Sequence, residues 1–194
     1  IGLLRSLTCV LTADPSPGNL LALARRHGAT RTFVVPAVIK TLVDLTEASG
    51  ETPPPLKTIF YGAAPMDVPL IQRCQRIFGC NFAQYYGMTE ACGSATFFPA
   101  SEHRIDMPDR LRSVGTLLPG FEMEIRDPQG RVLGPREAGE IYLRSPTLML
   151  GYWGQPEATA EVMQGGWYRT GDGGYVDEGG YLYITDRIKD MIIS

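Results

Sequence analysis

The chain has 194 residues, of which 44% are apolar and 20% are charged, and its mean hydropathy is −0.06. This length suffices for one sizeable hydrophobic core or two small ones, and the composition excludes an intrinsically disordered chain. The net charge of −3 comes with no basic stripe, so a nucleic acid is not an expected partner. No apolar run approaches the ~20 residues that span a bilayer, so no membrane span is expected.

The first half of the sequence alternates between helical and β-prone segments. Apolar residues at helical spacing followed by glycine predict helices, and short β-branched or aromatic runs between them predict strands. The predicted order is helix 19–27, strand 32–35, helix 37–49, strand 57–61, helix 67–78 and strand 81–85. Such alternation is typical of a parallel, helix-covered sheet, in which ligands bind at the carboxyl ends of the strands. The turns at 62–65 and 86–90 are expected at such ends.

From about Arg112 the sequence changes to short alternating runs separated by glycine-rich turns, which favours an antiparallel sheet or small barrel. The predicted strands are 121–126, 139–144 and 181–185. The expected fold class is therefore α/β, with a partial parallel helix-covered sheet followed by a smaller antiparallel β-sheet or barrel. We place the α/β subdomain at residues 1–105 and the β-rich subdomain at 106–186. The segment 151–159, an aromatic turn leading to a helix, is predicted to serve packing.

The block from Tyr85 to Glu90 follows a predicted strand and carries the groups that a nucleotide site needs. An exposed Tyr86 ring offers a face on which a purine can stack, and Gly87 lets the backbone pass close to a ligand. Thr89 supplies a hydroxyl and Glu90 a carboxylate, which suit a phosphate with its Mg²⁺. The alternative is a capped helix start with two buried tyrosines.

Two further charged positions are candidate ligand contacts. Asp172 lies in a glycine turn before a strand, where a carboxylate accepts hydrogen bonds from both hydroxyls of a ribose or caps its own backbone. Arg187 lies in the charged run 186–190. It is either a bidentate donor to a phosphate or ribose, or part of a solvated strand edge protected by charge. The residue types leave both pairs of alternatives open.

In this order and spacing, the motifs resemble those of the adenylate-forming enzymes, which include acyl-CoA synthetases, aryl-CoA ligases, luciferases and peptide-synthetase adenylation domains. The matching motifs are Gly62-Ala63-Ala64-Pro65, Tyr-Gly-Met-Thr-Glu at 86–90, the Gly-Glu-Ile…Gly-Tyr-Trp…Pro-Glu-Ala-Thr stretch at 139–159, Tyr-Arg-Thr-Gly-Asp at 168–172 and Asp-Arg-Ile-Lys-Asp-Met-Ile-Ile-Ser at 186–194. The resemblance covers nearly the whole chain. Within the family, Met88 and the last of these motifs resemble the acyl- and aryl-CoA synthetases.

The resemblance implies an adenosine-binding role for several positions. Gly62, Ala63 and Ala64 would line the adenine pocket, and Gly87 and Met88 are also expected to bind the cofactor. Tyr86 would stack on the base, and Asp172 would bind the ribose hydroxyls.

The resemblance also implies which residues serve catalysis. Thr89 would contact the α-phosphate and Glu90 would hold Mg²⁺. Arg187 would reach the ribose or phosphate. Lys189 stands where the family hinges, and residues 187–194 would be this hinge and the truncated start of a C-terminal domain.

The implied activity is ATP-dependent activation of a fatty or aryl carboxylic acid. The acid joins the α-phosphate of ATP to give an acyl-adenylate and pyrophosphate, and coenzyme A then takes the acyl group. The expected cofactors are therefore ATP/AMP, Mg²⁺ and coenzyme A, and the expected partner is the small carboxylic acid. The alternatives are a non-catalytic adenine-nucleotide-binding module and an adenylation domain that loads a carrier protein.

Two parts of the resembled enzymes do not occur in these residues: the Gly/Ser/Thr-rich phosphate loop and the small domain that carries a lysine for adenylation. Because such electrostatic groups supply several kcal/mol of barrier lowering, the chain alone is predicted to be inactive. A turnover of ~1 s⁻¹ or more would contradict this. The chain starts at Ile1 without Met, and both ends are expected to be cut. Four cysteines without CxxC spacing predict reduced thiols and a cytoplasmic protein.

Overall fold

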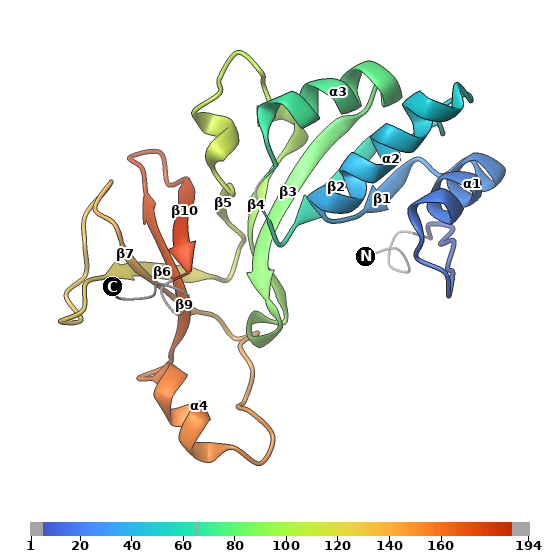
Figure 1. Cartoon of the computed structure of the whole chain (residues 1–194). Helices are drawn as coiled ribbons and strands as arrows, with labels where there is room; N and C mark the ends of the chain where they lie inside the picture. The colour runs from blue at the N-terminus through green and yellow to red at the C-terminus, as the bar shows by residue number, and fades with distance from the viewer. Residues whose placement is uncertain (1–5, 65, 188–194) are drawn as a thin grey trace, which may run out of the picture. The chain divides into compact units, whose positions relative to one another are not determined.

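The computed structural model describes residues 6–64 and 66–187, with side chains as far as residue 185 (Figure 1). The chain divides into two compact units, residues 1–83 and 84–194. Within the described residues, no helix is both long enough and apolar enough to cross a membrane.

The first unit alternates helices and strands as predicted. Its elements are α1 (Pro17–His27), β1 (Arg31–Phe33), α2 (Pro36–Ser49), β2 (Thr58–Gly62), α3 (Val68–Phe78) and the start of β3 (Asn81–Met88). Each of the three helices has a proline in its first turn and ends at a glycine in the left-handed conformation, which explains why the sequence marks their ends so clearly. β1 pairs parallel with β2, and α2 packs against both α1 and α3. The core contains the fully buried Ile39, Val43, Ile59 and Ile71.

The first sheet has the strand order β1-β2-β3-β4-β5, and its later strands are antiparallel. In the second unit β3 pairs antiparallel with β4 (Gly93–Phe98), which pairs antiparallel with β5 (Thr116–Leu117). The short helix η2 (Thr89–Ala91) joins β3 to β4, and a parallel crossover would need roughly a dozen residues or more. The predicted parallel sheet is therefore confirmed for β1 and β2, while the whole sheet is mixed.

The second unit also holds an antiparallel sheet of order β10-β9-β7-β6, with β8 paired to β9, as the spacing of the glycine-rich turns predicted (Figure 1). Its strands are β6 (Glu122–Arg126), β7 (Gly139–Arg144), β8 (Met163–Gln164), β9 (Trp167–Val176) and β10 (Leu182–Arg187). The other helical segments are η3 (Ala100–Glu102), η4 (Arg110–Arg112) and α4 (Pro156–Val162). Val114, Ile125, Ile141, Leu143 and Leu182 form its buried core with Ala95.

The division between the two compact units falls within β3, between residues 83 and 84. The predicted boundary at residues 105 and 106 instead marks a change in the spacing of strands and turns in the sequence. The subdomain ranges 1–105 and 106–186 therefore stay a prediction. The four cysteines are free thiols, buried at Cys74 and Cys80 and exposed at Cys9 and Cys92.

Candidate functional site

The predicted nucleotide-binding block lies at the end of β3. Tyr86, Gly87 and Met88 are the last residues of the strand, and Thr89 and Glu90 begin η2. The turn predicted at 86–90 is therefore wrong for its first three residues, because β4 pairs with the strand as far as Met88. Beyond the strand, the side chain of Thr89 is exposed and that of Glu90 is half-buried.

Gly87 has no room for a side chain. A Cβ atom there would lie 1.9 Å from the carbonyl oxygen of Gly93 and 2.6 Å from the Cα of Ser94. The register of β3 and β4 shifts at this point, since Tyr86 pairs with Thr96 and Gly87 with Ser94. The close approach seen at Gly87 is thus made by the neighbouring strand, and its contact with a ligand stays a prediction.

The side chains of Tyr86 and Asp172 meet although they stand 86 positions apart in the chain. The Tyr86 hydroxyl donates a hydrogen bond to Oδ2 of Asp172 over 2.7 Å. The Tyr86 ring packs against the core of the second unit, so it is half-buried and not the exposed ring that the sequence suggested. Burial, followed by the charge and hydrogen bond of Asp172, raises the pKa of Tyr86, and the phenol therefore remains a donor.

Asp172 lies inside β9, and the expectation that it sits in a turn before a strand is wrong. The glycine-rich sequence does not interrupt the strand, because β7 and β10 pair with it on its two sides. The pairing with β7 is irregular here: Glu140 pairs with Gly173 but Tyr142 pairs with Arg169. Such a bulge bends a strand and re-aims a side chain, which is how β9 turns Asp172 toward Tyr86.

Thr170 stabilises this irregular part of β9. Its buried hydroxyl donates to the carbonyl oxygen of Ile141 over 2.8 Å and accepts the N–H of Asp172 over 3.1 Å. Gly171 between them has φ 78°, a conformation that favours glycine. The Thr-Gly-Asp sequence thereby holds the backbone that carries Asp172.

Arg187 is the cross-strand neighbour of Asp172. The pairing of β9 with β10 sets the Cα atoms of the two residues opposite each other, beside a second irregularity in register. Two positions predicted to reach the ribose therefore share one stretch of the strand pair. The side chain of Arg187, and all of Lys189 with the predicted hinge, lie outside the described residues, so their roles stay predictions.

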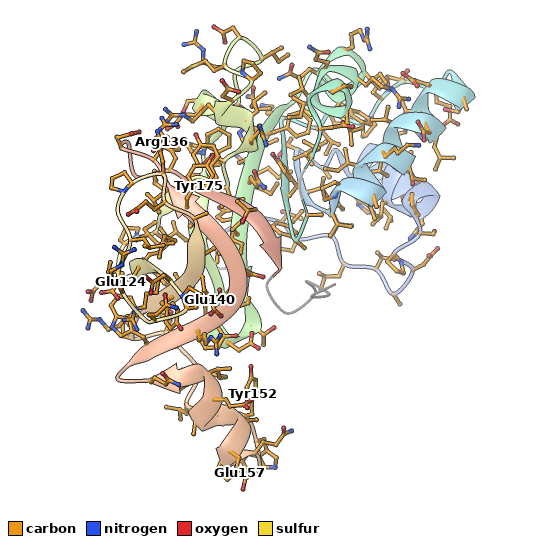
Figure 2. The ribbon with its side chains drawn as sticks, turned by 60° about the vertical axis from the view of Figure 1, so that its left-hand side comes forward. Glu124, Arg136, Glu140, Tyr152, Glu157 and Tyr175 are labelled. Atoms are coloured by element: carbon orange, nitrogen blue, oxygen red, sulfur yellow. The ribbon has the colours of Figure 1, made fainter. Side chains whose placement is uncertain are left out.

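Glu90 is held by the segment that leads into α4. The Tyr152 hydroxyl donates to Oε1 of Glu90 over 2.9 Å, and the N–H of Met149 donates to the main-chain carbonyl of Glu90 over 2.7 Å. Figure 2 shows Tyr152 between Glu157, at the start of α4, and Glu140 on the sheet. From the sequence we predicted that this segment serves packing, and the contact of Tyr152 with Glu90 was not predicted. Nothing in the local sequence pattern relates residues 62 positions apart.

A third tyrosine, Tyr168, lies in the same strand as Asp172. Tyr168 has only 4% of its surface exposed. Burial raises the pKa of Tyr168, a hydrogen bond with Tyr152 raises it further, and the charges of Glu90 and Asp172 act in the same direction. The charges of the two carboxylates predicted to bind Mg²⁺ and ribose therefore act on the same buried phenol.

Gly62, Ala63 and Ala64 lie in the first unit, at the carboxyl end of β2. Gly62 ends the strand and is buried, whereas both alanines are exposed. Ala63 has φ 66°, a left-handed conformation that is unfavourable for alanine by roughly 1–2 kcal/mol. Strain of this kind often accompanies ligand-binding turns, and the place of these residues in an adenine pocket stays a prediction.

The donor set at Glu90 fits a Mg²⁺ ion that arrives with a nucleotide. Mg²⁺ keeps several waters and is usually bound by one or two carboxylates together with substrate phosphates. The Tyr152 hydroxyl donates to Oε1 of the Glu90 carboxylate, and the side chain of Glu90 is half-exposed. Thr89 adds an exposed hydroxyl next to it in the chain.

Most of the chain is similar to known proteins. The family described as AMP-binding enzyme matches residues 1–153. The chain is 37% identical, over 88% of its length, to 33% of a fatty acid–[acyl-carrier-protein] ligase of Streptomyces coeruleorubidus. It is 36% identical, over 99% of its length, to 38% of a feruloyl-CoA synthase of an Amycolatopsis species.

Among solved structures, the chain is similar over its whole length to o-succinylbenzoate coenzyme A synthetase from Bacillus subtilis, in complex with ATP and magnesium ion. The TM-score is 0.84 and the identity 32%, and the match covers 39% of that enzyme. The chain thus spans between a third and two-fifths of the length of these relatives. Because the family match extends over most of the chain and the fold agrees with that of a solved relative, the chain belongs to the AMP-binding enzymes.

Proposed function

We propose that the chain forms the part of an AMP-forming acid–thiol ligase that binds adenosine and its phosphates. Such a ligase activates a carboxylic acid with ATP and transfers the acyl group to coenzyme A. The observation that carries the proposal is the hydrogen bond of 2.7 Å between Tyr86 and Asp172. It joins the residue expected to stack on the adenine to the residue expected to bind the ribose. An adenosine needs both groups at one place.

The chemistry requires positioning and charge neutralisation more than covalent help from the protein. A carboxylate oxygen of the acid attacks the α-phosphorus of ATP, and the bond to pyrophosphate breaks. The Thr89 hydroxyl would donate to an α-phosphate oxygen, and Glu90 would hold the Mg²⁺. When bound, this ion offsets the negative charge of the phosphates.

The relatives support the proposed substrate class. One is named for a fatty acid and an acyl-carrier protein, and another for feruloyl-CoA. We therefore infer a fatty or aryl carboxylic acid as substrate, with coenzyme A as acceptor and a carrier protein as the alternative. The two acceptors are distinguished by supplying each, with ATP and the acid, to the full-length protein and measuring the thioester by mass spectrometry. A non-catalytic nucleotide-binding module would bind AMP without any pyrophosphate exchange.

Substituting Asp172 with alanine tests the adenosine site directly. Asp172→Ala removes a charged acceptor for the ribose hydroxyls, so AMP binding to the chain should weaken by about 10- to 100-fold. The measurement is isothermal titration calorimetry with AMP. Asp106→Ala is the matched control, because Asp106 is an exposed carboxylate paired with Arg104. Equal AMP affinity of Asp172→Ala and the parent chain would contradict the proposed site.

A further inference from the structure

Three hydrogen bonds from residues 147–152 join the loop before α4 to η2. The first two join the Thr147 hydroxyl to the carbonyl of Ala91 over 3.3 Å and the N–H of Met149 to the carbonyl of Glu90 over 2.7 Å. The third joins the Tyr152 hydroxyl to Oε1 of Glu90 over 2.9 Å. Both the backbone and the side chain of Glu90 are thus set by the same loop.

The position of Tyr152 is itself determined by α4. The N–H of Tyr152 donates to Oγ1 of Thr159 over 2.9 Å, and this hydroxyl donates to the carbonyl of Gln155 over 2.8 Å. Gly151 has φ 151°, and a Cβ there would come within 2.8 Å of the Thr159 side chain. The Gly-Tyr backbone is therefore packed directly on Thr159, which leaves Tyr152 little freedom to turn away from Glu90.

We propose that Tyr152 is a positioning residue for Glu90: its hydroxyl fixes one carboxylate oxygen, so that the other is oriented toward a divalent cation bound with the nucleotide. The inference rests on the proposed function, because that function makes Glu90 the metal ligand. Partners that orient a metal-binding side chain commonly change metal affinity or activity by 10- to 100-fold when removed.

The test measures equilibrium binding of Mn²⁺ with ATP by electron paramagnetic resonance, in the full-length protein and without the carboxylic acid. Tyr152→Phe keeps the ring and removes the donor, so Mn²⁺ affinity should fall about 10-fold or more. The same variant should raise the Mg²⁺ concentration for half-maximal activity while the KM for the acid stays unchanged. Tyr181→Phe is the matched control, because its hydroxyl also donates to a carboxylate, that of Glu102 over 2.5 Å.

A double-mutant cycle with Glu90→Gln separates the possible failures. If Tyr152 acts through Glu90, Tyr152→Phe should cause no further loss of Mn²⁺ affinity in the Glu90→Gln background. Unchanged affinity of Glu90→Gln would overturn the metal role of Glu90 and this inference with it. A weakened Glu90→Gln beside an unaffected Tyr152→Phe would overturn the inference alone.

A second pair of variants covers the case in which Tyr152→Phe does not fold. Thr159→Val removes the hydroxyl that holds the Tyr152 N–H, whereas Thr159→Ser keeps it. Mn²⁺ affinity should fall in Thr159→Val and return close to the parent value in Thr159→Ser. Equal affinities in these two variants would count against the positioning role.

Discussion

Gly87 shows why one glycine in the nucleotide-binding block is required by the fold whether or not it touches a ligand. The space that a side chain would need is filled by the backbone of β4 at Gly93 and Ser94. Backbone atoms in a paired strand cannot move aside, whereas the end of a flexible side chain can. The block therefore contains at least one residue whose identity follows from strand packing.

Gly87→Ala should lower the free energy of unfolding of the chain by about 3 kcal/mol, since a methyl group 1.9 Å from a carbonyl oxygen forces β3 and β4 apart. Urea denaturation followed by circular dichroism measures the change. Gly18→Ala is the control, because no atom lies within 4 Å of a Cβ at that helical position. A Gly87→Ala variant as stable as Gly18→Ala would show that the two strands are less closely packed than described.

β9 is the element on which the candidate site depends, because it carries both Tyr168 and Asp172. An uninterrupted β-ladder would leave the Asp172 side chain in regular alternation, and the bulge opposite β7 changes that direction. The Thr170 hydroxyl supplies partners for a carbonyl and an N–H at this point of the ladder. The strand can therefore bend without leaving either group unpaired.

Thr170→Val should destabilise the second unit by about 1–3 kcal/mol, because the isosteric side chain neither donates to the Ile141 carbonyl nor accepts from the Asp172 N–H. Thermal unfolding of the chain measures the loss. Thr185→Val, at an exposed position of β10, should change stability by no more than about 0.5 kcal/mol. Indistinguishable melting of the two variants would rule out this role for the Thr170 hydroxyl.

On the scale of a complete folding unit, His103 couples stability to pH. It is 5% exposed and lies against Phe98, with ring centroids 4.4 Å apart. Burial lowers the pKa of His103 below its ordinary value of 6.5, while the Pro99 carbonyl and the charge of Glu102 act in the opposite direction. His103 therefore binds a proton less readily in the folded unit than in the unfolded chain.

The contribution of His103 to stability should be complete above about pH 6.5 and should diminish as the pH falls toward the depressed pKa of the folded state. The unfolded state binds more protons in that window, so the free energy of unfolding rises with pH, by at most about 1.4 kcal/mol per pH unit for one group. Urea titrations between pH 5 and 7 should show a shallower pH dependence for His103→Gln than for the parent chain. Parallel curves would refute the coupling, and carboxylates common to both proteins cancel in the comparison.

The order and type of the first elements were predictable from the sequence alone, because helix spacing, prolines and glycines act within a few neighbouring residues. Gly28, Gly50 and Gly79 end three helices through their own backbone conformation, whatever the rest of the chain does. The motif order likewise predicted the family before any contact was known, and the family match over residues 1–153 confirms it.

The tertiary structure decided which of these residues meet. Strand pairing makes Asp172 part of β9 and sets Arg187 opposite it, and packing within the second unit brings Asp172 to the Tyr86 hydroxyl. The contact of Tyr152 with Glu90 likewise joins segments that no local pattern relates. Such contacts depend on the register between strands and on bulges within them. Hydrophobic spacing along the chain carries information about the face of each element, but not about which distant side chain that face will touch.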